Sequence, residues 1–290
     1  MRTFAEHNPI AVAIYFLSVT VIAMFSMDPT ILTLSLLGSL LLFFSRNKFK
    51  HGKSHLYTLL LFIILTLVNP LVSHNGVTVL FVINNNPITL EALIYGAASA
   101  VMIVSVMYWF RSFSQIMTSD KLLYIFGALS PKLALIFSMA LRYMPLFTAQ
   151  SKKINGAQRV IGLYKDDNIV DSFRGGLRIF SVMISWALEN GIVTADSMTA
   201  RGYGIGKRSR FSLFTFRSGD IFLLTLSILF AIISAFGCGT VEFTYYPAIT
   251  SSNITLYGVI GYISYAVLVL LPTFIEVKEA IKWKYLKSKI

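Results

Sequence analysis

The sequence predicts an all-α protein that crosses a membrane about six times and carries further amphipathic helices outside the bilayer. Hydrophobic residues make up 56% of the 290 residues, charged residues only 13%, and the mean hydropathy is +0.70. A soluble domain averages about 25% charged residues and somewhat under half apolar residues. This composition leaves too few charges for a soluble surface, so a polytopic membrane protein is expected.

Six segments are apolar over a length close to the roughly 20 residues that a helix needs to cross the hydrocarbon core. They are Ile10–Met27, Thr30–Ser45, Leu56–Val72, Leu90–Phe110, Ile221–Gly237 and Leu256–Ile275. The first has no small-residue cleavage pattern, which predicts a retained helix rather than a signal peptide. Asp28 and Pro29 predict a tight turn, so the first two spans should form a helical hairpin.

All 25 Lys and Arg residues lie before the first predicted span, in the loop between the second and third spans, in the stretch 111–219 or in the C-terminal tail. The stretch 111–219 contains 15 of them, whereas the loops 28–29, 73–89 and 238–255 contain none. Lys and Arg resist translocation, so both termini and the stretch 111–219 are expected in the cytoplasm. Topology and anionic lipid headgroups explain the formal net charge of +12 without a nucleic-acid partner.

Three parts follow from this pattern: a bundle of four spans in 1–110, cytoplasmic or interfacial helices in 111–219, and two spans with a basic cytoplasmic tail in 220–290. Within the middle part, residues 122–147 and 177–192 are apolar but interrupted by charges such as Lys132, Arg142 and Glu189. One charge at the centre of a membrane helix costs about 2.5–3.5 kcal/mol. Helices at the interface or beneath the spans are therefore predicted, and two additional spans are the alternative.

Residues 195–204, ADSMTARGYG, predict a helix that ends at an arginine. Gly202 and Gly204 should stop the helix, because glycine is the usual residue in a left-handed cap. Arg201 would then project from the last turn, where a guanidinium interacts favourably with the helix dipole and can bind a carboxylate with two hydrogen bonds. An ordinary helix-ending arginine is the alternative.

Motifs of enzymes and metal sites are incomplete. Asp166, Asp167 and Asp171 match half of an aspartate-rich diphosphate site, but there is no second cluster, and helix capping is the expected role. His51 and His55 flank a loop and lack the glutamate of a zinc-binding HExxH helix. No P-loop sequence occurs. We therefore predict that the chain is not an enzyme and has no cofactor and no metal site.

Ionisable residues are nearly absent from the predicted spans. Glu91 and Asp220 lie only at the starts of spans. Transport subunits that bind ions or polar substrates usually keep polar groups near the bilayer midplane. The chain alone is thus not expected to be the substrate-binding subunit.

The segment 122–204 resembles the transmembrane T component of energy-coupling factor (ECF) transporters, the EcfT/CbiQ-like family. The resemblance rests on SPKLALIFSMALRYMPLF, KKINGAQ, SWALEN and ADSMTARGYG, and it extends to NPLVSHNGVTVLF at 69–81. It implies a scaffold in the cell membrane that links two ABC-type ATPases to a separate substrate-binding S component for a vitamin or metal ion. ATP hydrolysis would then drive movement of the S component.

The resemblance also implies two Ala-Arg-Gly-type motifs at helix ends that insert into grooves on the ATPases. The implied docking residues are Ala200, Arg201, Gly202, Gln158, Arg159, Ile161 and Gly162. In the first motif Ile161 stands where the family has arginine. Either Arg159 supplies the charge from two residues upstream, or the contact is mainly apolar.

The apolar coupling helices are expected to transmit the movement to the S component. The residues predicted to face that component are Leu133, Leu135, Met139, Met144, Ile179, Met183 and Leu188. Two other functions stay open: a conventional ABC permease with its own polar substrate path, and an intramembrane prenyltransferase-like enzyme that uses Asp166 and Asp167.

Overall fold

The computed structural model describes residues 4–47, 52–73, 75–83, 86–162, 169–206, 214–251 and 255–287. Within these ranges the chain has nine α-helices, a 3-10 helix η1 (Phe4–Glu6) and two short β-hairpins. It divides into two compact units: unit 1 comprises residues 1–122 and 214–290, and unit 2 comprises residues 123–213.

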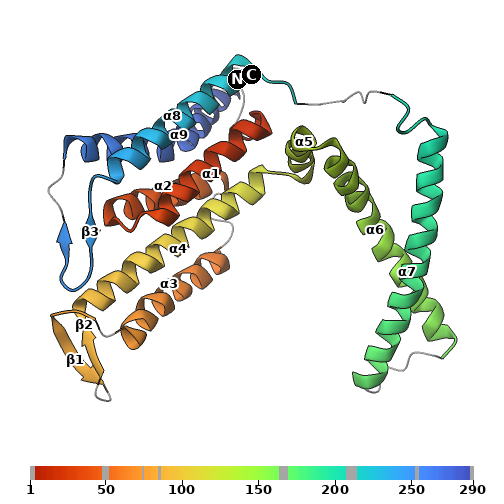
Figure 1. Ribbon diagram of the computed structural model, residues 1–290, viewed down its shortest axis with the longest axis horizontal. Helices are drawn as coiled ribbons and strands as arrows, with labels where there is room; N and C mark the ends of the chain where they lie inside the picture. The colour runs from red at the N-terminus through yellow and green to blue at the C-terminus, as the bar shows by residue number, and fades with distance from the viewer. Residues whose placement is uncertain are drawn as a thin grey trace. The chain divides into compact units, whose positions relative to one another are not determined.

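Unit 1 is built from six long helices (Figure 1). They are α1 (Pro9–Phe25), α2 (Pro29–Asn47), α3 (Gly52–Val72), α4 (Leu90–Ile116), α8 (Ser218–Cys238) and α9 (Leu256–Lys287). Each corresponds to one predicted span; α1 ends at Phe25, two residues before the predicted end at Met27, and α9 continues past the predicted end at Ile275. Five are long and apolar enough to cross a membrane, and α1, with 17 residues, is at the short end of the usual range of about 17–25. The prediction of an all-α polytopic membrane protein is confirmed.

Aromatic side chains hold the helices of unit 1 together. Trp109, Tyr15 and Tyr265 are among the largest fully buried side chains. The Trp109 indole nitrogen donates to Ser35 Oγ at 3.0 Å, and the Tyr15 hydroxyl donates to the Leu268 carbonyl at 3.0 Å. Buried Trp and Tyr need such acceptors for their polar atoms. These bonds tie α4 to α2 and α1 to α9.

Helices α8 and α9 meet at glycines. A Cβ added at Gly237 would lie 2.6 Å from the Cα of Gly261, and a Cβ at Gly261 would lie 2.9 Å from the backbone nitrogen of Cys238. Helices in a bilayer gain little hydrophobic energy from each other, so they associate through close backbone packing at small residues. A side chain at Gly237 or Gly261 would therefore clash with the backbone of the neighbouring helix.

Two hairpins join the helices at the ends away from the N-terminus. Strands β1 (Val79–Ile83) and β2 (Asn86–Thr89) pair between α3 and α4, and β3 (Phe243–Thr244) pairs with β4 (Thr250–Ser251) between α8 and α9. Glu91, at the start of α4, accepts hydrogen bonds from the Thr78 backbone N–H at 3.2 Å and the Thr78 hydroxyl at 2.8 Å. This buried carboxylate therefore fixes the base of the first hairpin.

Unit 2 contains most of α5 (Ser119–Leu129), together with α6 (Pro131–Val160) and α7 (Ile169–Ala200). Pro131 divides the apolar segment 122–147 into two helices, because proline suits the first position of a helix and pushes the preceding residue, here Ser130, to an extended conformation. Helices α6 and α7 run antiparallel and cross (Figure 1). By length and composition α6 is also a candidate span, as in the alternative interpretation, and no residue of its apolar window is buried.

The glycine contact predicts the effect of a single methyl group. Gly261→Ala should destabilise unit 1 by about 1–3 kcal/mol, because the new Cβ meets backbone that cannot move aside. Thermal unfolding of the purified protein in mild detergent measures this.

Gly191→Ala in α7 is the matched control, since nothing lies within 4 Å of its added Cβ. Alanine in a helix interior is favoured over glycine by about 0.5–1 kcal/mol, so this variant should not lower stability. Equal shifts for the two variants would contradict the close contact between α8 and α9.

Candidate docking site at the coupling helices

Helix α7 ends in a backbone motif that leaves Arg201 at the cap. The Tyr203 N–H donates to the Met198 carbonyl at 3.0 Å, and the Gly202 N–H donates to the Thr199 carbonyl at 2.9 Å. This pair of bonds is the Schellman motif, and it requires a left-handed residue, which Gly202 supplies with φ +83°. The predicted helix end is confirmed, and the Arg201 side chain is exposed beside it.

Helix α6 ends in a similar way, with a different side chain at the cap. Ile161 is the cap residue, its N–H donates to the Ala157 carbonyl at 3.1 Å, and the N–H of Gly162 donates to the Arg159 carbonyl at 3.1 Å. Gly162 is left-handed, with φ +75°. Ile161 and Gly162 thus occupy the positions that Arg201 and Gly202 occupy in α7, whereas Arg159 lies within the last helical turn.

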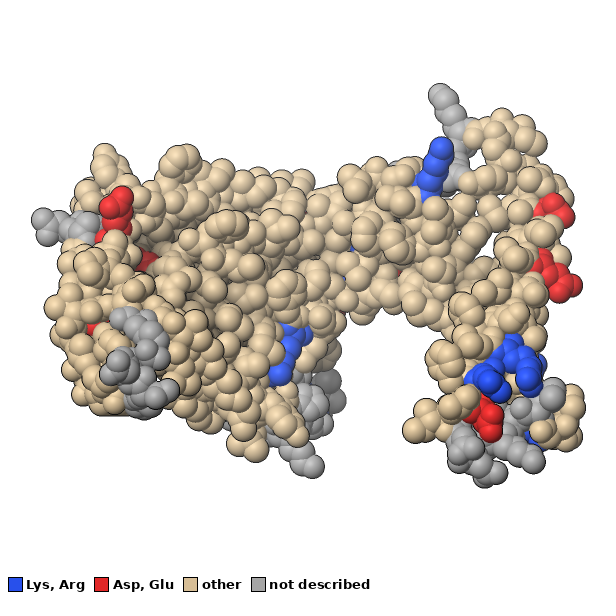
Figure 2. Space-filling view, turned by 60° about the horizontal axis from the view of Figure 1, so that its bottom comes forward, with Lys and Arg blue, Asp and Glu red and all other residues tan. Residues whose placement is uncertain are grey.

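The end of α6 is apolar at its tip and basic around it. Val160, Ile161 and, at the start of α7, Ile169 are 89%, 70% and 91% exposed. Exposed basic residues near this end, within the described ranges, are Lys152, Lys153, Arg159 and Arg174. Figure 2 shows Lys and Arg side chains gathered where α6 ends and α7 begins. This helix end therefore exposes side chains for both contacts that the sequence left open, Arg159 for a charged contact and Ile161 for an apolar one.

Gln158 is the one predicted docking residue that is buried in the described part of unit 2. Its side chain is 7% exposed, and its Oε1 accepts no hydrogen bond from the described residues. An unsatisfied buried polar atom costs about 1–3 kcal/mol. Ala200, like Arg159 and Ile161, is exposed.

The antiparallel crossing directs the two helix ends away from each other. The Tyr143 hydroxyl lies 2.8 Å from Thr194 Oγ1, and the rings of Phe147 and Trp186 meet edge to face with centroids 5.5 Å apart. At 1.5 Å per residue, the last residue of each helix is about 20 Å along its axis from the Phe147–Trp186 contact. The two glycine-capped ends therefore lie at opposite ends of the helix pair.

The apolar residues predicted to face the S component form two groups. Leu135, Met139, Ile179 and Met183 are half-buried. Leu133, Met144 and Leu188 are exposed by 41%, 62% and 64%. The half-buried residues of α6 recur every four positions in line with Tyr143, which contacts α7, so they lie toward the face where the helices meet. The exposed group is the part open to a partner.

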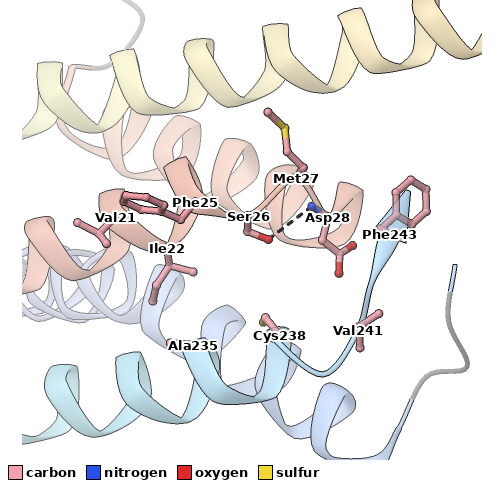
Figure 3. A pocket seen from close by; sticks show the side chains of 11 residues that line it. Val21, Ile22, Phe25, Ser26, Met27, Asp28, Ala235, Cys238, Val241 and Phe243 are labelled. Carbon is pink, nitrogen blue, oxygen red and sulfur yellow. Dashed lines mark hydrogen bonds between the residues drawn. The ribbon is translucent and has the colours of Figure 1, made fainter. Parts of the chain in front are cut away.

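A pocket of about 370 Å³ lies between α1, α8 and the start of β3 (Figure 3). Most of its lining is apolar, and its charged member is Asp28. The Asp28 carboxylate accepts hydrogen bonds from the Thr30 N–H at 3.1 Å, from the Thr30 hydroxyl at 2.7 Å and from the Tyr262 hydroxyl. These bonds make Asp28 the cap of α2, whereas the sequence predicted only a tight turn at this position.

The histidine and aspartate motifs add no chemistry to the described structure. Gly52 and Lys53 lie with His55 in the first turn of α3, so the predicted loop between the histidines is wrong. The Nδ1 of His55 lies 2.8 Å from the Tyr108 hydroxyl. No group of three or more His, Cys, Asp or Glu in the described ranges could hold a metal ion. His51, Asp166 and Asp167 lie outside those ranges.

The CbiQ family model, described as cobalt transport protein, matches residues 4–213, which is most of the chain and includes both helix ends. The chain belongs to the CbiQ family. A relative of this CbiQ-family chain is the energy-coupling factor transporter transmembrane protein EcfT 1 of Listeria monocytogenes serotype 1/2a (strain 08-5578), 31% identical over 99 residues. The aligned region is 33% of this chain and 37% of the relative, so the chain spans little more than a third of that protein's length.

The cap geometry of this CbiQ-family chain predicts the effect of Gly202→Ala. The added Cβ has room, with its nearest neighbour at 3.7 Å, so the penalty is the left-handed backbone itself, about 1–2 kcal/mol. Amide hydrogen exchange at positions 202 and 203 should become faster, because these amides donate the two cap bonds.

Gly206→Ala provides the local control. Its added Cβ also meets nothing within 4 Å, and Gly206 is not left-handed. Exchange at positions 202 and 203 should stay at the wild-type rate in this variant. An unchanged rate in Gly202→Ala would show that the cap does not hold the end of α7.

Proposed function

We propose that this chain is the transmembrane scaffold of an ECF-type importer, which couples ATP hydrolysis by two ABC-type ATPases to movement of a substrate-binding S component. The observation that carries the proposal is the crossed pair of α6 and α7, with two similarly capped helix ends at opposite ends of the pair. One helix pair could in this way engage two ATPases at once. Membership of the CbiQ family and the similarity to an ECF transmembrane protein support the same role.

The exposed surface of unit 2 supports binding to other molecules. Among the described residues of α6 and α7, only Gln158 and Gly175 are buried, and large apolar side chains such as Met144, Phe180 and Leu188 are more than 60% exposed. A soluble monomer rarely exposes an apolar patch larger than a few hundred Å². ATPases, an S component and lipid are the partners proposed to cover these helices.

The two helix ends are proposed to dock by different chemistry. Arg201 suits a carboxylate in an ATPase groove, because its guanidinium can donate two parallel hydrogen bonds to both oxygens. At the other end Ile161 and Val160 would enter an apolar groove. The surrounding charges, including Arg159, would attract an acidic rim at longer range. In this arrangement the first contact is mainly apolar.

The coupling step is proposed to be mechanical. Opening and closing of the ATPase pair would move the two helix ends apart and together. Because helices are stiff, the movement would reach Leu133, Met144 and Leu188, where the S component would lie. The S component, not this chain, would select the vitamin or metal ion, and both termini would be cytoplasmic, as the Lys and Arg distribution indicates.

Arg201→Glu tests the charged contact. Truncating one partner of a buried charge pair costs about 2–5 kcal/mol or more, so affinity for the ATPases should fall by a factor of roughly 30 or more. Co-purification of the ATPases with the tagged chain, followed by titration in detergent, measures this. Arg142→Glu, at an exposed position in the middle of α6, should bind as the wild type does. Equal binding by both variants would contradict docking by Arg201.

The end of α6 is tested by comparing Ile161→Ala with Arg159→Ala. If Ile161 is buried on docking, its truncation should weaken binding by about 2–5 kcal/mol, whereas loss of a charge at the rim should cost about 0–1 kcal/mol. The same titration measures both. A larger loss for Arg159→Ala would mean that Arg159 replaces the missing arginine.

A further inference from the structure

Two connections of the chain join unit 2 to unit 1. Unit 2 begins at residue 123, shortly after α4 ends at Ile116, and it ends at residue 213, shortly before α8 begins at Ser218. We call residues 117–122 and 214–220, the second of which includes the first turn of α8, the two roots of the coupling unit. The N-terminal segment, residues 4–8, contacts both roots, although it is more than a hundred residues from either along the chain.

The first root is held by Lys121. Its side chain is buried, and its ammonium donates to the Ile116 carbonyl at 2.8 Å and to the Ala5 carbonyl at 2.5 Å. Burial lowers the pKa of Lys121, the nearby Arg46 lowers it further, and Glu6 raises it. A buried ammonium needs acceptors for its protons. Here one acceptor is the end of α4 and the other is the N-terminal segment.

The second root is held by Asp220, in the first turn of α8 and only 1% exposed. Its Oδ1 accepts from the Asn8 N–H at 3.1 Å and lies 2.7 Å from His7 Nδ1, and its Oδ2 accepts from the Arg217 N–H at 3.0 Å. The Asn8 side chain in turn caps α1, accepting from the Ile10 N–H at 3.0 Å. Asp220 therefore joins the start of α8 to the start of α1.

An apolar contact fixes the segment itself. Phe4 is fully buried, and its ring meets those of Tyr15 and Phe16 on α1 edge to face, with centroids 5.4 Å and 6.1 Å apart. A terminal segment is poorly ordered unless such contacts tie it down. Residues 4–8 are thus attached to α1, to the first root and to the second root.

We propose that residues 4–8 form a clasp that holds both roots of the coupling unit against α1, and that Lys121 and Asp220 are positioning residues for energy coupling. Helices α6 and α7 can transmit movement only when the two roots that connect them to unit 1 are held in place. With the clasp closed, movement of the ends of α6 and α7 passes to the S component; with the clasp open, bending at the roots absorbs it. The inference rests on the proposed coupling function and adds to it the device that anchors α6 and α7.

The test uses the complete complex, purified with its ATPases and S component and held either with ADP or with ATP and vanadate. Hydrogen exchange is measured on α6, on α7 and on the S component in both states. In Lys121→Met and in Asp220→Asn the nucleotide-dependent difference should persist in α6 and α7 and fall at least fivefold in the S component. Lys121→Arg, which keeps the charge and can still donate, should restore it.

Glu91→Gln is the matched control. It changes another buried carboxylate of the same unit, which accepts from the Thr78 N–H at 3.2 Å and lies at the start of α4, about 38 Å along the helix from Ile116. Its exchange differences should equal those of the wild type. If Asp220→Asn does not fold, His7→Ala opens the same contact more gently, because the His7 side chain is 15% exposed.

The outcomes separate the two proposals. A wild-type complex without bound ATPase, or without any nucleotide-dependent change, would overturn the proposed function. A wild type that responds, with Lys121→Met and His7→Ala responding equally in the S component, would overturn the clasp alone. A purely structural role would lower the melting temperature of the variants and leave the ratio of the two exchange differences unchanged, which also overturns the clasp.

Discussion

The Asp220 carboxylate joins the two parts of the chain that make up unit 1, residues 1–122 and 214–290. It lies in the first turn of α8, where the chain re-enters unit 1 after residues 123–213, and it binds the segment that precedes α1. Burying a carboxylate costs several kcal/mol unless hydrogen bonds replace its water. The donors come from Asn8, from His7 and from the first turn of α8 itself. Without these donors in place the buried charge would be unsatisfied, so the contact specifies one position for α8, and α9 follows through its glycine contact with α8.

The two units use similar apolar residues under different constraints. In unit 1 the helices meet at glycines and at aromatic hydroxyl and indole groups that find acceptors on neighbouring helices, as a bilayer interior requires. In unit 2 the corresponding surfaces are left exposed: Met144 and Leu188 have no cover in the described chain. Unit 2 therefore has the character of one half of an interface, which agrees with a scaffold that is completed by its partners.

The ends of α6 and α7 have a similar backbone geometry but carry different side chains at the cap. Left-handed Gly162 and Gly202 stop α6 and α7 in a similar way, and the cap residue before each differs, isoleucine in one and arginine in the other. Backbone shape at a docking site can thus be kept while the chemistry of the contact changes. For the proposed transporter this means two ATPase contacts of unequal character.

The sequence by itself determined the class of protein, the six spans, the glycine-stopped end of α7 and the family. These features depend on local composition and period: an apolar run of sufficient length must become a helix in lipid, because no water is present to bond its backbone. The family became visible because its motifs lie within continuous segments such as 195–204. The ends of the helices were predicted less accurately, as the continuation of α9 beyond Ile275 shows.

Only the tertiary structure decided which distant groups meet. Sequence placed Asp220 and Glu91 at the starts of spans but did not reveal that one binds the N-terminal segment and the other a hairpin. It also left Lys121 as one of many basic residues, although this ammonium is buried between two carbonyls. Such pairings depend on how the helices pack in three dimensions, and a hydrogen bond across two hundred residues leaves no periodic trace in a single sequence.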